Sequence, residues 1–377
     1  MCLSLFLLLS LFGQNGAPKG IDLSREIPPW VRRTASPIIH RESSILLQEK
    51  ENGPIEARLA FRATKILRVA AANDSVVFGS DSYTLSEEKR RLVFSKTASV
   101  PVITSKALYP APGSPNSYKH RVGHPEQNML YGPGRWFHDR QIEVTYETDE
   151  DWKGPKPVFS GNLLPKTLEK LKAKKELRLG ISGDSISTGL DASALVKAPP
   201  EQKGYPELLA AGIENAFGSK VKMTNRAVSG TSIVYGLQDW PKLIQSKPDL
   251  IVVAYGMNDV GRRDPKWFEG RVKEYLNQIH KDLPDTEIIL VACMLGNREW
   301  IHTPREMFTS YRDQLKSFER PGVAFADLTQ VWDTLLANKH DHDLTGNGLN
   351  HPNDYGHRLY AWTMLTILGD SGQKSAN

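Results

Sequence analysis

The chain has 377 residues, of which 40% are hydrophobic and 24% charged, and it contains 29 glycines and 24 prolines. These proportions are ordinary for a globular protein and exclude a disordered, collagen-like or repeat-biased chain. The 48 Lys and Arg exceed the 43 Asp and Glu by a net charge of +5, which is too small and dispersed for a nucleic-acid-binding surface. We expect no nucleic-acid partner, and the length predicts two domains.

An apolar run at residues 3–12 is followed by Gly13, Asn15 and Ala17. The run is shorter than the roughly 20 residues of a membrane span and is typical of a secretory signal peptide. We therefore expect residues 1–17 to be a cleaved signal peptide, the protein to be secreted or periplasmic, and no stable membrane insertion. A retained anchor and a misplaced start codon are the alternatives, because no Lys or Arg precedes the run.

The chain has two cysteines, Cys2 and Cys293. Removal of the signal peptide would leave Cys293 as the only thiol, which excludes an internal disulfide. Cys293 ends the apolar run 288–293, so we predict a small core residue on a buried strand rather than a nucleophile.

Short strands between turn residues characterise the first half of the chain. After an N-terminal extension at 18–44, residues 45–162 are predicted to form an all-β accessory domain, a jelly-roll-like sandwich. Its clearest strand is 142–146, which alternates apolar and polar residues, and shorter strands are predicted at 91–94 and 100–103. A Pro- and Gly-rich stretch from Pro110 to Gly134 is predicted to be a long loop, and loops of that length are often functional.

The second half has a different pattern. A linker helix is predicted within 163–176, followed by a domain at 177–369 in which apolar strands alternate with amphipathic helices, and by a tail at 370–377. This alternation predicts a parallel sheet covered on both faces, with ligands bound beyond the carboxyl ends of the strands. The predicted strands are 177–182, 221–225, 250–254, 287–294 and 323–327, and the predicted helices are 205–217, 265–280, 304–318 and 354–368.

Polar blocks follow three of these strands. The turn Gly183-Asp184-Ser185 lacks the glycine and lysine pattern of a phosphate loop, so we interpret Ser185 as a nucleophile. Gly230 and Asn258 follow the next two strands, at the same sheet edge, where a backbone N–H and a side-chain amide suit an oxyanion hole. His351 would supply the base. The alternative for each is structural: a turn glycine and helix caps.

Together these blocks resemble the SGNH (GDSL) hydrolase superfamily over residues 177–369, with His351-Pro352-Asn353 as the last block. The resemblance implies a flavodoxin-like three-layer α/β/α fold and ester hydrolysis through an acyl-serine intermediate. It further implies an oxyanion hole from the backbone N–H groups of Ser185 and Gly230 and the side chain of Asn258. Asp184 and Asp259 are expected to support the site, and no cofactor is expected.

The sequence departs from the family at one position. Members usually carry Asp three residues before the catalytic His, where this chain has Gly348. Asp343 is our first candidate for the third triad member, and a backbone carbonyl is the alternative, because the imidazole needs a partner that fixes its tautomer. His357 also follows an Asp by three residues, but it is followed by Arg358 and we reject it as the base.

Two further groups of residues are candidates for binding. The cluster His340-Asp341-His342-Asp343 has metal-ligating side chains, but its spacing fits no common metal site and we expect no metal. A stacking platform for sugar rings has four aromatic candidates, and two arginines are candidates for contacting an anionic polysaccharide. The candidates are Trp240, Trp267, Trp300 and Tyr235 for the platform, and Arg262 and Arg263 for the polyanion.

Export, an esterase domain and a preceding β-sandwich resemble the two-domain carbohydrate acetylesterases of this superfamily. The resemblance implies a secreted serine esterase that removes O-acetyl groups from an acetylated polysaccharide or oligosaccharide. A lipid or aryl esterase is the alternative enzyme, and a catalytically weak carbohydrate-binding protein is the alternative of another class. The sequence leaves the oligomeric state open.

Overall fold

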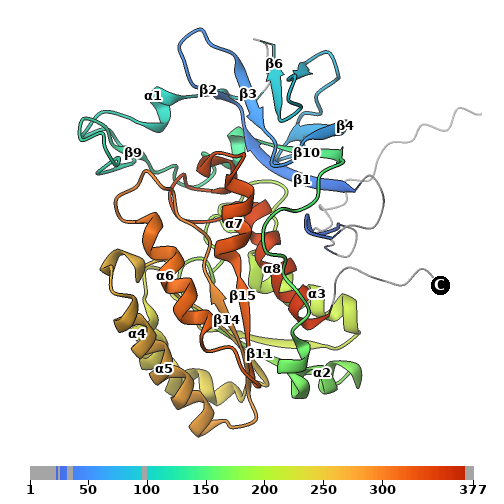
Figure 1. The fold of residues 1–377 in the computed structure, drawn as a ribbon, viewed down its shortest axis with the longest axis vertical. Helices are drawn as coiled ribbons and strands as arrows, with labels where there is room; N and C mark the ends of the chain where they lie inside the picture. The colour runs from blue at the N-terminus through green and yellow to red at the C-terminus, as the bar shows by residue number, and fades with distance from the viewer. Residues whose placement is uncertain (1–22, 24–25, 32–36, 96–99, 370–377) are drawn as a thin grey trace, which may run out of the picture.

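A computed structural model describes residue 23 and residues 26–31, 37–95 and 100–369. The expected signal peptide at 1–17 and tail at 370–377 lie outside these residues. Figure 1 shows a parallel sheet flanked by helices, with the antiparallel strands above the carboxyl ends of its strands. Among the residues that the structure describes, no helix has the length and hydropathy of a membrane span.

The parallel sheet has the strand order β12-β11-β13-β14-β15. In chain order this is 2-1-3-4-5, the flavodoxin-like order, which confirms the expected fold. The order reverses between β11 and β13, and in such sheets ligands bind beside this point, beyond the strand ends. The strands are β11 (Leu177–Gly183), β12 (Val221–Asn225), β13 (Leu250–Ala254), β14 (Glu287–Ala292) and β15 (Val323–Asp327).

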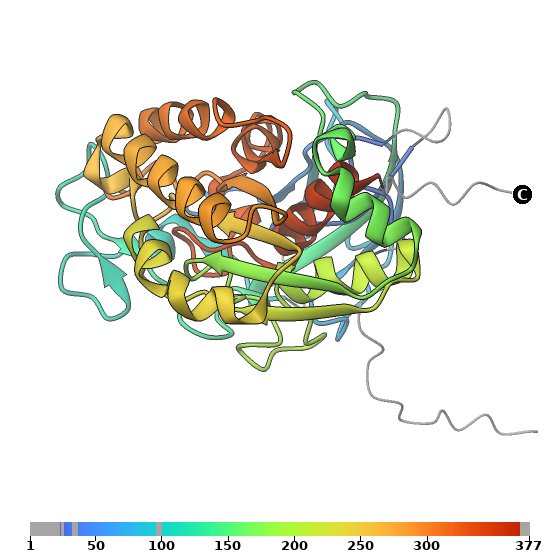
Figure 2. The ribbon, with the colours of Figure 1, turned by 90° about the horizontal axis from the view of Figure 1, so that it is seen from below.

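Helices cover both faces of this sheet (Figures 1 and 2). α3 packs against α8 on one face, and α5 packs against α4 and α6 on the other. We did not predict α4 or α7; α4 contains Gly236 and Pro241, which weaken a helical pattern. The helices are α2 (Pro165–Lys172), α3 (Tyr205–Phe217), α4 (Ile233–Leu243), α5 (Pro265–Asp282), α6 (Arg305–Lys316), α7 (Leu328–Leu336) and α8 (Asp354–Leu368), with short helices η3 (Gly161–Leu163), η4 (Ile244–Ser246), η5 (Val260–Arg262) and η6 (Asp341–Leu344).

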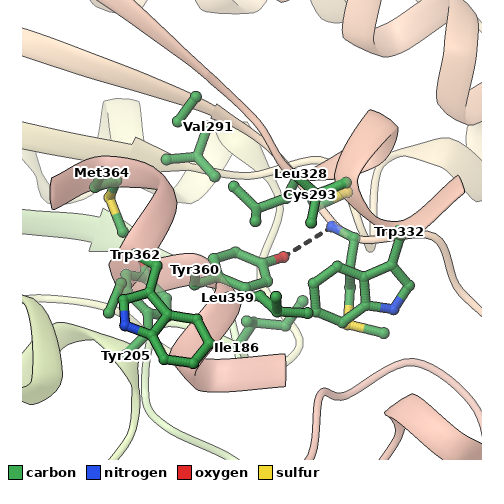
Figure 3. Packing of buried hydrophobic residues seen from close by; sticks show 14 of the residues in the cluster. Ile186, Tyr205, Val291, Cys293, Leu328, Trp332, Leu359, Tyr360, Trp362 and Met364 are labelled. Carbon is green, nitrogen blue, oxygen red and sulfur yellow. Dashed lines mark hydrogen bonds between the residues drawn. The ribbon is translucent and has the colours of Figure 1, made fainter. Parts of the chain in front are cut away.

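α8 is buried along its whole length, because the parallel sheet and α3 pack against it on one side and β1 on another. Figure 3 shows its Tyr360 among aromatic and aliphatic side chains from several elements, including Tyr205 of α3 and Trp332 of α7. The Tyr360 hydroxyl accepts a hydrogen bond from the Met294 backbone N–H at 2.8 Å. This core anchors α8, which begins at Asp354, three residues after His351.

The antiparallel region contains two main sheets. One has the order β1-β10-β4, and the other the order β5-β6-β3-β2-β7. β1 begins at Ile38, so the β-rich part starts inside the stretch expected to be an extension, and β7 overlaps the strand predicted at 100–103 at Ile103 only. The strands are β1 (Ile38–Ile45), β2 (Leu47–Gln48), β3 (Ile55–Arg58), β4 (Ala63–Ala71), β5 (Tyr83–Leu85), β6 (Arg91–Phe94), β7 (Ile103–Thr104) and β10 (Gln141–Thr148).

Buried polar contacts join the two regions. The Lys339 ammonium lies 2.6 Å from the Glu42 carboxylate of β1, and both side chains are fully buried. The Tyr146 hydroxyl donates to the same carboxylate at 2.6 Å, and the Gln141 amide donates to the Thr345 carbonyl at 2.7 Å. Buried charges need such partners, so these contacts fix how the regions sit together.

The long loop predicted at 110–134 contains a short hairpin of β8 (Ser117–Tyr118) and β9 (Met129–Leu130). It connects α1 (Ser105–Leu108) to η2 (His138–Arg140). In Figure 1 it lies to the side of the antiparallel sheets, beyond α1. Backbone hydrogen bonds tie it to the second half of the chain, as described below.

Candidate active site

Ser185 lies on a tight turn directly after β11. Gly183 is required there, because a Cβ atom would lie 2.2 Å from the Ser187 hydroxyl oxygen. The Asp184 carboxylate accepts a hydrogen bond from the Ile186 N–H at 3.0 Å. Ile186 points into the core beside Tyr205 (Figure 3). These contacts fix the position of the Ser185 side chain at the sheet edge.

Three side chains form a hydrogen-bonded chain at this edge. Ser185 Oγ lies 2.9 Å from His351 Nε2, and His351 Nδ1 lies 2.6 Å from Asp191 Oδ2. All three residues are buried. A neutral imidazole that donates from Nδ1 to the carboxylate presents an unprotonated Nε2 to the serine hydroxyl, as in a Ser-His-Asp triad.

Asp191, the acid of this chain, lies six residues after Ser185 on the same loop. Its backbone is in the left-handed region with φ of 62°, and His138 Nε2 donates to its carbonyl at 3.0 Å. Gly346 allows the close approach, because a Cβ there would lie 2.7 Å from the Cβ of Asp191. We did not single out Asp191 from the sequence. The one available signal is its place in a loop that leaves the same sheet edge as Ser185.

Asp343, our first candidate for the third triad member, does not contact His351, so that expectation is wrong. Its Oδ1 accepts hydrogen bonds from the Ser44 hydroxyl at 3.1 Å and the Ile45 N–H at 2.9 Å. Its Oδ2 accepts from the His340 N–H at 2.9 Å. Both oxygens are therefore occupied: Oδ1 joins η6 to β1, and Oδ2 caps the start of η6.

Gly348, where the family usually has Asp, has no room for a side chain. Its φ is 89°, and a Cβ would lie 2.9 Å from the Phe137 ring and 3.0 Å from the Leu130 carbonyl oxygen. Both neighbours belong to the antiparallel region. That region thus occupies the space that a side chain at position 348 would need.

Asn347 organises the loop that carries His351. Its side-chain oxygen accepts from the backbone N–H groups of Leu349, Asn350 and His351 at 2.9, 3.1 and 3.3 Å. Its own carbonyl accepts from the Gly132 N–H at 2.9 Å. The His351 loop is therefore held by the Asn347 side chain from within and by Gly132 of the antiparallel region from outside.

The expected oxyanion-hole residues lie on adjacent loops. The Thr188 and Ser229 hydroxyls are 3.3 Å apart, which places Gly230 beside the Ser185 turn. Gly230 has a φ of 76°, and within the described residues neither its N–H nor that of Ser185 has a hydrogen-bond partner. The Asn258 amide donates one hydrogen to the Thr231 carbonyl at 2.8 Å, which leaves its second hydrogen available. Free donors from three loops suit a developing oxyanion.

Asp184 and Asp259 lie buried beneath these loops. The Asp259 carboxylate accepts from the Ile233 N–H at 3.2 Å, and so fixes the start of α4 just after Gly230. Burial raises the pKa of each carboxyl to about 7, and the nearby Asp259 also raises the pKa of Asp184. Cys293 is a buried free thiol in the same core, and its burial raises its pKa well above the usual value.

His357, which we rejected as the base, is part of the core. Its Nδ1 accepts from the Tyr205 N–H at 3.2 Å and its Nε2 donates to the Leu190 carbonyl at 3.1 Å. Burial lowers its pKa to about 4, so it is neutral at pH 7. Asn353 caps α8, accepting from the Gly356 N–H at 3.0 Å.

The cluster at 340–343 does not converge on one point. His340 pairs with Glu49, Asp341 pairs with Arg298 and Arg305, and His342 lies 3.3 Å from the Asn297 amide. Within the described ranges, no three His, Cys, Asp or Glu side chains are arranged to hold a metal ion.

Of the four aromatic candidates, Trp300 alone lies where the two regions meet. Trp240 is buried and donates to Asp282 at 2.7 Å, while the Arg262 guanidinium lies 4.2 Å from the Trp267 ring centre. Tyr235 is half-buried on α4. Arg263 pairs with Glu306 at the surface.

Residues 181–359 match the model of the GDSL-like lipase/acylhydrolase family. A search among curated proteins found no match. Similar solved structures include a two-domain esterase active on acetylated mannans, with 16% identity, a TM-score of 0.45, and coverage of 59% of this chain and 57% of that one. The chain thus spans little more than half the length of that esterase.

Two other similar structures are shorter enzymes, and the alignment with this chain covers almost all of each of them. Axe2, an acetylxylan esterase from Geobacillus stearothermophilus, is 18% identical with a TM-score of 0.43, covering 53% of this chain and 97% of its own. LAE5, an alpha/beta hydrolase from the metagenome of Lake Arreo, is 22% identical with a TM-score of 0.42, covering 51% and 95%. From this family match, residues 181–359 of the chain are similar to GDSL-like lipases and acylhydrolases.

Proposed function

We propose that the protein is an exported serine esterase that removes O-acetyl groups from a polysaccharide, with Ser185, His351 and Asp191 as its triad. The observation that carries the mechanism is the chain of two hydrogen bonds, 2.9 Å from Ser185 to His351 and 2.6 Å from His351 to Asp191. Its completeness argues against the alternative of a catalytically weak binding protein, which depended on a missing acid.

The geometry supports a two-step reaction. The Ser185 oxygen attacks the ester carbonyl carbon while His351 Nε2 takes the hydroxyl proton, and Asp191 stabilises the imidazolium. The carbonyl oxygen becomes an oxyanion facing the N–H groups of Ser185 and Gly230 and the Asn258 amide. The C–O bond of the leaving alcohol then breaks, and His351 returns the proton to it. A water molecule repeats the sequence on the acyl-serine and releases the acid.

Burial supports a small acyl group and a large alcohol. Ser185 and His351 are only 3% and 7% exposed, whereas Gly230 and Asn258 lie on the surface. An acetyl group can be held at the buried side while a bulky sugar alcohol remains on the exposed side. Export rests on the apolar run at residues 3–12 and would bring the enzyme to such a polymer.

Hydrolysis of para-nitrophenyl acetate and octanoate tests this proposal. We expect preference for acetate, loss of activity in Ser185→Ala and His351→Ala, and retention of activity in His357→Gln if that variant folds. Equal or greater activity on octanoate would favour the lipid esterase. Release of acetate from acetylated xylan and acetylated mannan oligosaccharides tests the substrate class, and mass spectrometry of the secreted protein locates the mature N-terminus.

A further inference from the structure

Three aromatic side chains gather where the long loop meets the loop after β14. The rings of Tyr118 and Tyr131 have centres 5.3 Å apart, and Tyr118 and Trp300 have centres 5.8 Å apart. Tyr118 and Tyr131 come from the antiparallel region, and Trp300 follows the parallel strand β14. We call these three residues the aromatic cluster. Both regions of the molecule contribute to it.

The aromatic cluster is exposed although its backbone is firmly held. Tyr118 is 48% exposed, and Tyr131 and Trp300 are half-buried. Beneath them, the Val122 N–H donates to the Glu299 carbonyl at 2.7 Å, and the Arg121 guanidinium pairs with the Glu299 carboxylate at 2.6 Å. Exposed rings on a fixed backbone lose little conformational freedom when they bind a ligand.

Hydrogen bonds place the aromatic cluster beside the catalytic loop. The residue after Tyr131, Gly132, donates to the carbonyl of Asn347, the residue that organises the His351 loop. On the other side, the Asn297 N–H donates to the Leu349 carbonyl at 2.7 Å, three residues before Trp300. The backbone next to Tyr131 and the backbone just before Trp300 are therefore both hydrogen-bonded to residues 347–349.

Electrostatics give a second indication of this proximity. Burial raises the pKa of the Tyr131 phenol first, and the nearby carboxylate of Asp191 raises it further. The Tyr131 side chain is thus within electrostatic reach of the acid of the triad. Within the described residues, neither the Tyr118 nor the Tyr131 hydroxyl takes part in a hydrogen bond.

We infer that the aromatic cluster is a subsite for a sugar ring of the substrate, adjacent to the residue that bears the acyl group. This inference rests on the proposed function and adds the residues that select the alcohol. Pyranose rings present apolar C–H faces that pack on aromatic rings, and hydroxyls at their edges that suit unpaired phenols. The occupant is a neutral oligosaccharide, because the neighbouring Arg121 is already neutralised by Glu299.

Kinetics on two substrates test the subsite. Tyr118→Ala and Trp300→Ala should lower the ratio of kcat/KM for acetylated oligosaccharide to kcat/KM for para-nitrophenyl acetate by about tenfold, mainly through KM. Tyr118→Phe keeps the ring and should restore most of the ratio. Phe159→Ala, which removes a ring that is 55% exposed near the far end of α8, is the matched control and should leave the ratio unchanged. An unchanged ratio in both alanine variants would overturn the inference.

Binding separates this inference from the proposed function. Calorimetry with Ser185→Ala and the same oligosaccharides, acetylated and deacetylated, should detect binding that Tyr118→Ala weakens by about tenfold in the same background. If the wild-type enzyme cleaves no acetylated oligosaccharide but Ser185→Ala binds them through Tyr118, the substrate proposal fails and the subsite stands. If neither Tyr118→Ala nor Trp300→Ala changes the binding, the subsite inference is wrong, whichever esters the enzyme hydrolyses.

Discussion

The two walls of the active site are held in different ways. The wall with Ser185, Gly230 and Asn258 is fixed from within the parallel-sheet region, by Asp184, Asp259 and contacts between neighbouring loops. The wall with His351 depends on the antiparallel region. Gly132 and Gln141 donate to the backbone of residues 345–347, and Phe137 packs on Gly348. The comparison therefore indicates that the β-rich region positions His351, the proposed base, in addition to any contact that it makes with a ligand.

The largest effect on activity should come from the hydrogen bond between Asp191 and His351, which joins the two walls. Asp191→Asn should lower kcat by about 10³–10⁴, because the amide favours the wrong imidazole tautomer. Asp343→Asn, the matched control, should change kcat far less, since Asp343 lies in the joint between β1 and η6. Steady-state kinetics on para-nitrophenyl acetate measure both. A larger loss of kcat in Asp343→Asn would return the acid role to that residue.

A second experiment weakens the support of the His351 wall. Lys339→Met should lower the free energy of unfolding by about 3–5 kcal/mol, because Glu42 would be left buried without its cation. The double variant Lys339→Met, Glu42→Leu should recover much of this loss. Urea denaturation followed by circular dichroism measures the difference. Equal stability of the single variant and the wild type would show that the pair does not hold the regions together.

Gly348→Asp asks whether the acid can be moved to the position usual in the family. We expect a loss of about 1–3 kcal/mol of stability, because the new side chain meets Phe137 and Leu130. In an Asp191→Asn background it should restore no activity. Thermal unfolding and esterase assays give both results. Recovery of kcat in the double variant would contradict the closed geometry at position 348.

The smallest effect concerns pH and the Ser185 wall. Burial raises the pKa of Asp184 to about 7, so folded protein binds its proton more tightly than unfolded protein does. Its contribution to stability is therefore full below about pH 4 and is lost as the pH rises through 7. The Asp184→Asn variant cannot ionise at this position. The difference between its Tm and that of the wild type should therefore grow in favour of the variant as the pH rises from about 4 to 7, and stay constant above pH 7. A difference that does not change with pH would refute this.

Much of the parallel region could be predicted because its strands are continuous apolar runs and its helices have strong boundaries, as at Pro165 and Gly218. Ser185 and His351 could be predicted because each stands in a short block of distinctive residues. Asp191 could not, since 160 positions separate it from its partner and its turn conformation depends on packing against Gly346. Nearness in the sequence favoured Asp343, but its Oδ1 accepts hydrogen bonds from β1 and its Oδ2 accepts one from the His340 N–H.

The aromatic candidates show the same limit. The sequence alone does not distinguish Trp240 from Trp300 as a binding residue. In the structure they differ in burial, because Trp240 packs in the core with Tyr275, whereas Trp300 packs on Tyr118. The partner of Trp300 lies 182 positions earlier in a different sheet region. Only the assembled fold brings such residues together.

The acid and the nucleophile of the proposed triad share one short loop, while the base stands alone on another. A displacement of residues 345–351 would therefore break both hydrogen bonds of His351 in a single event. Partial states with an intact acid–base pair but a detached serine would be rare, so the enzyme should lose activity in step with the ordering of that one segment. Hydrogen exchange at residues 345–351 would then report the fraction of molecules that are competent to react.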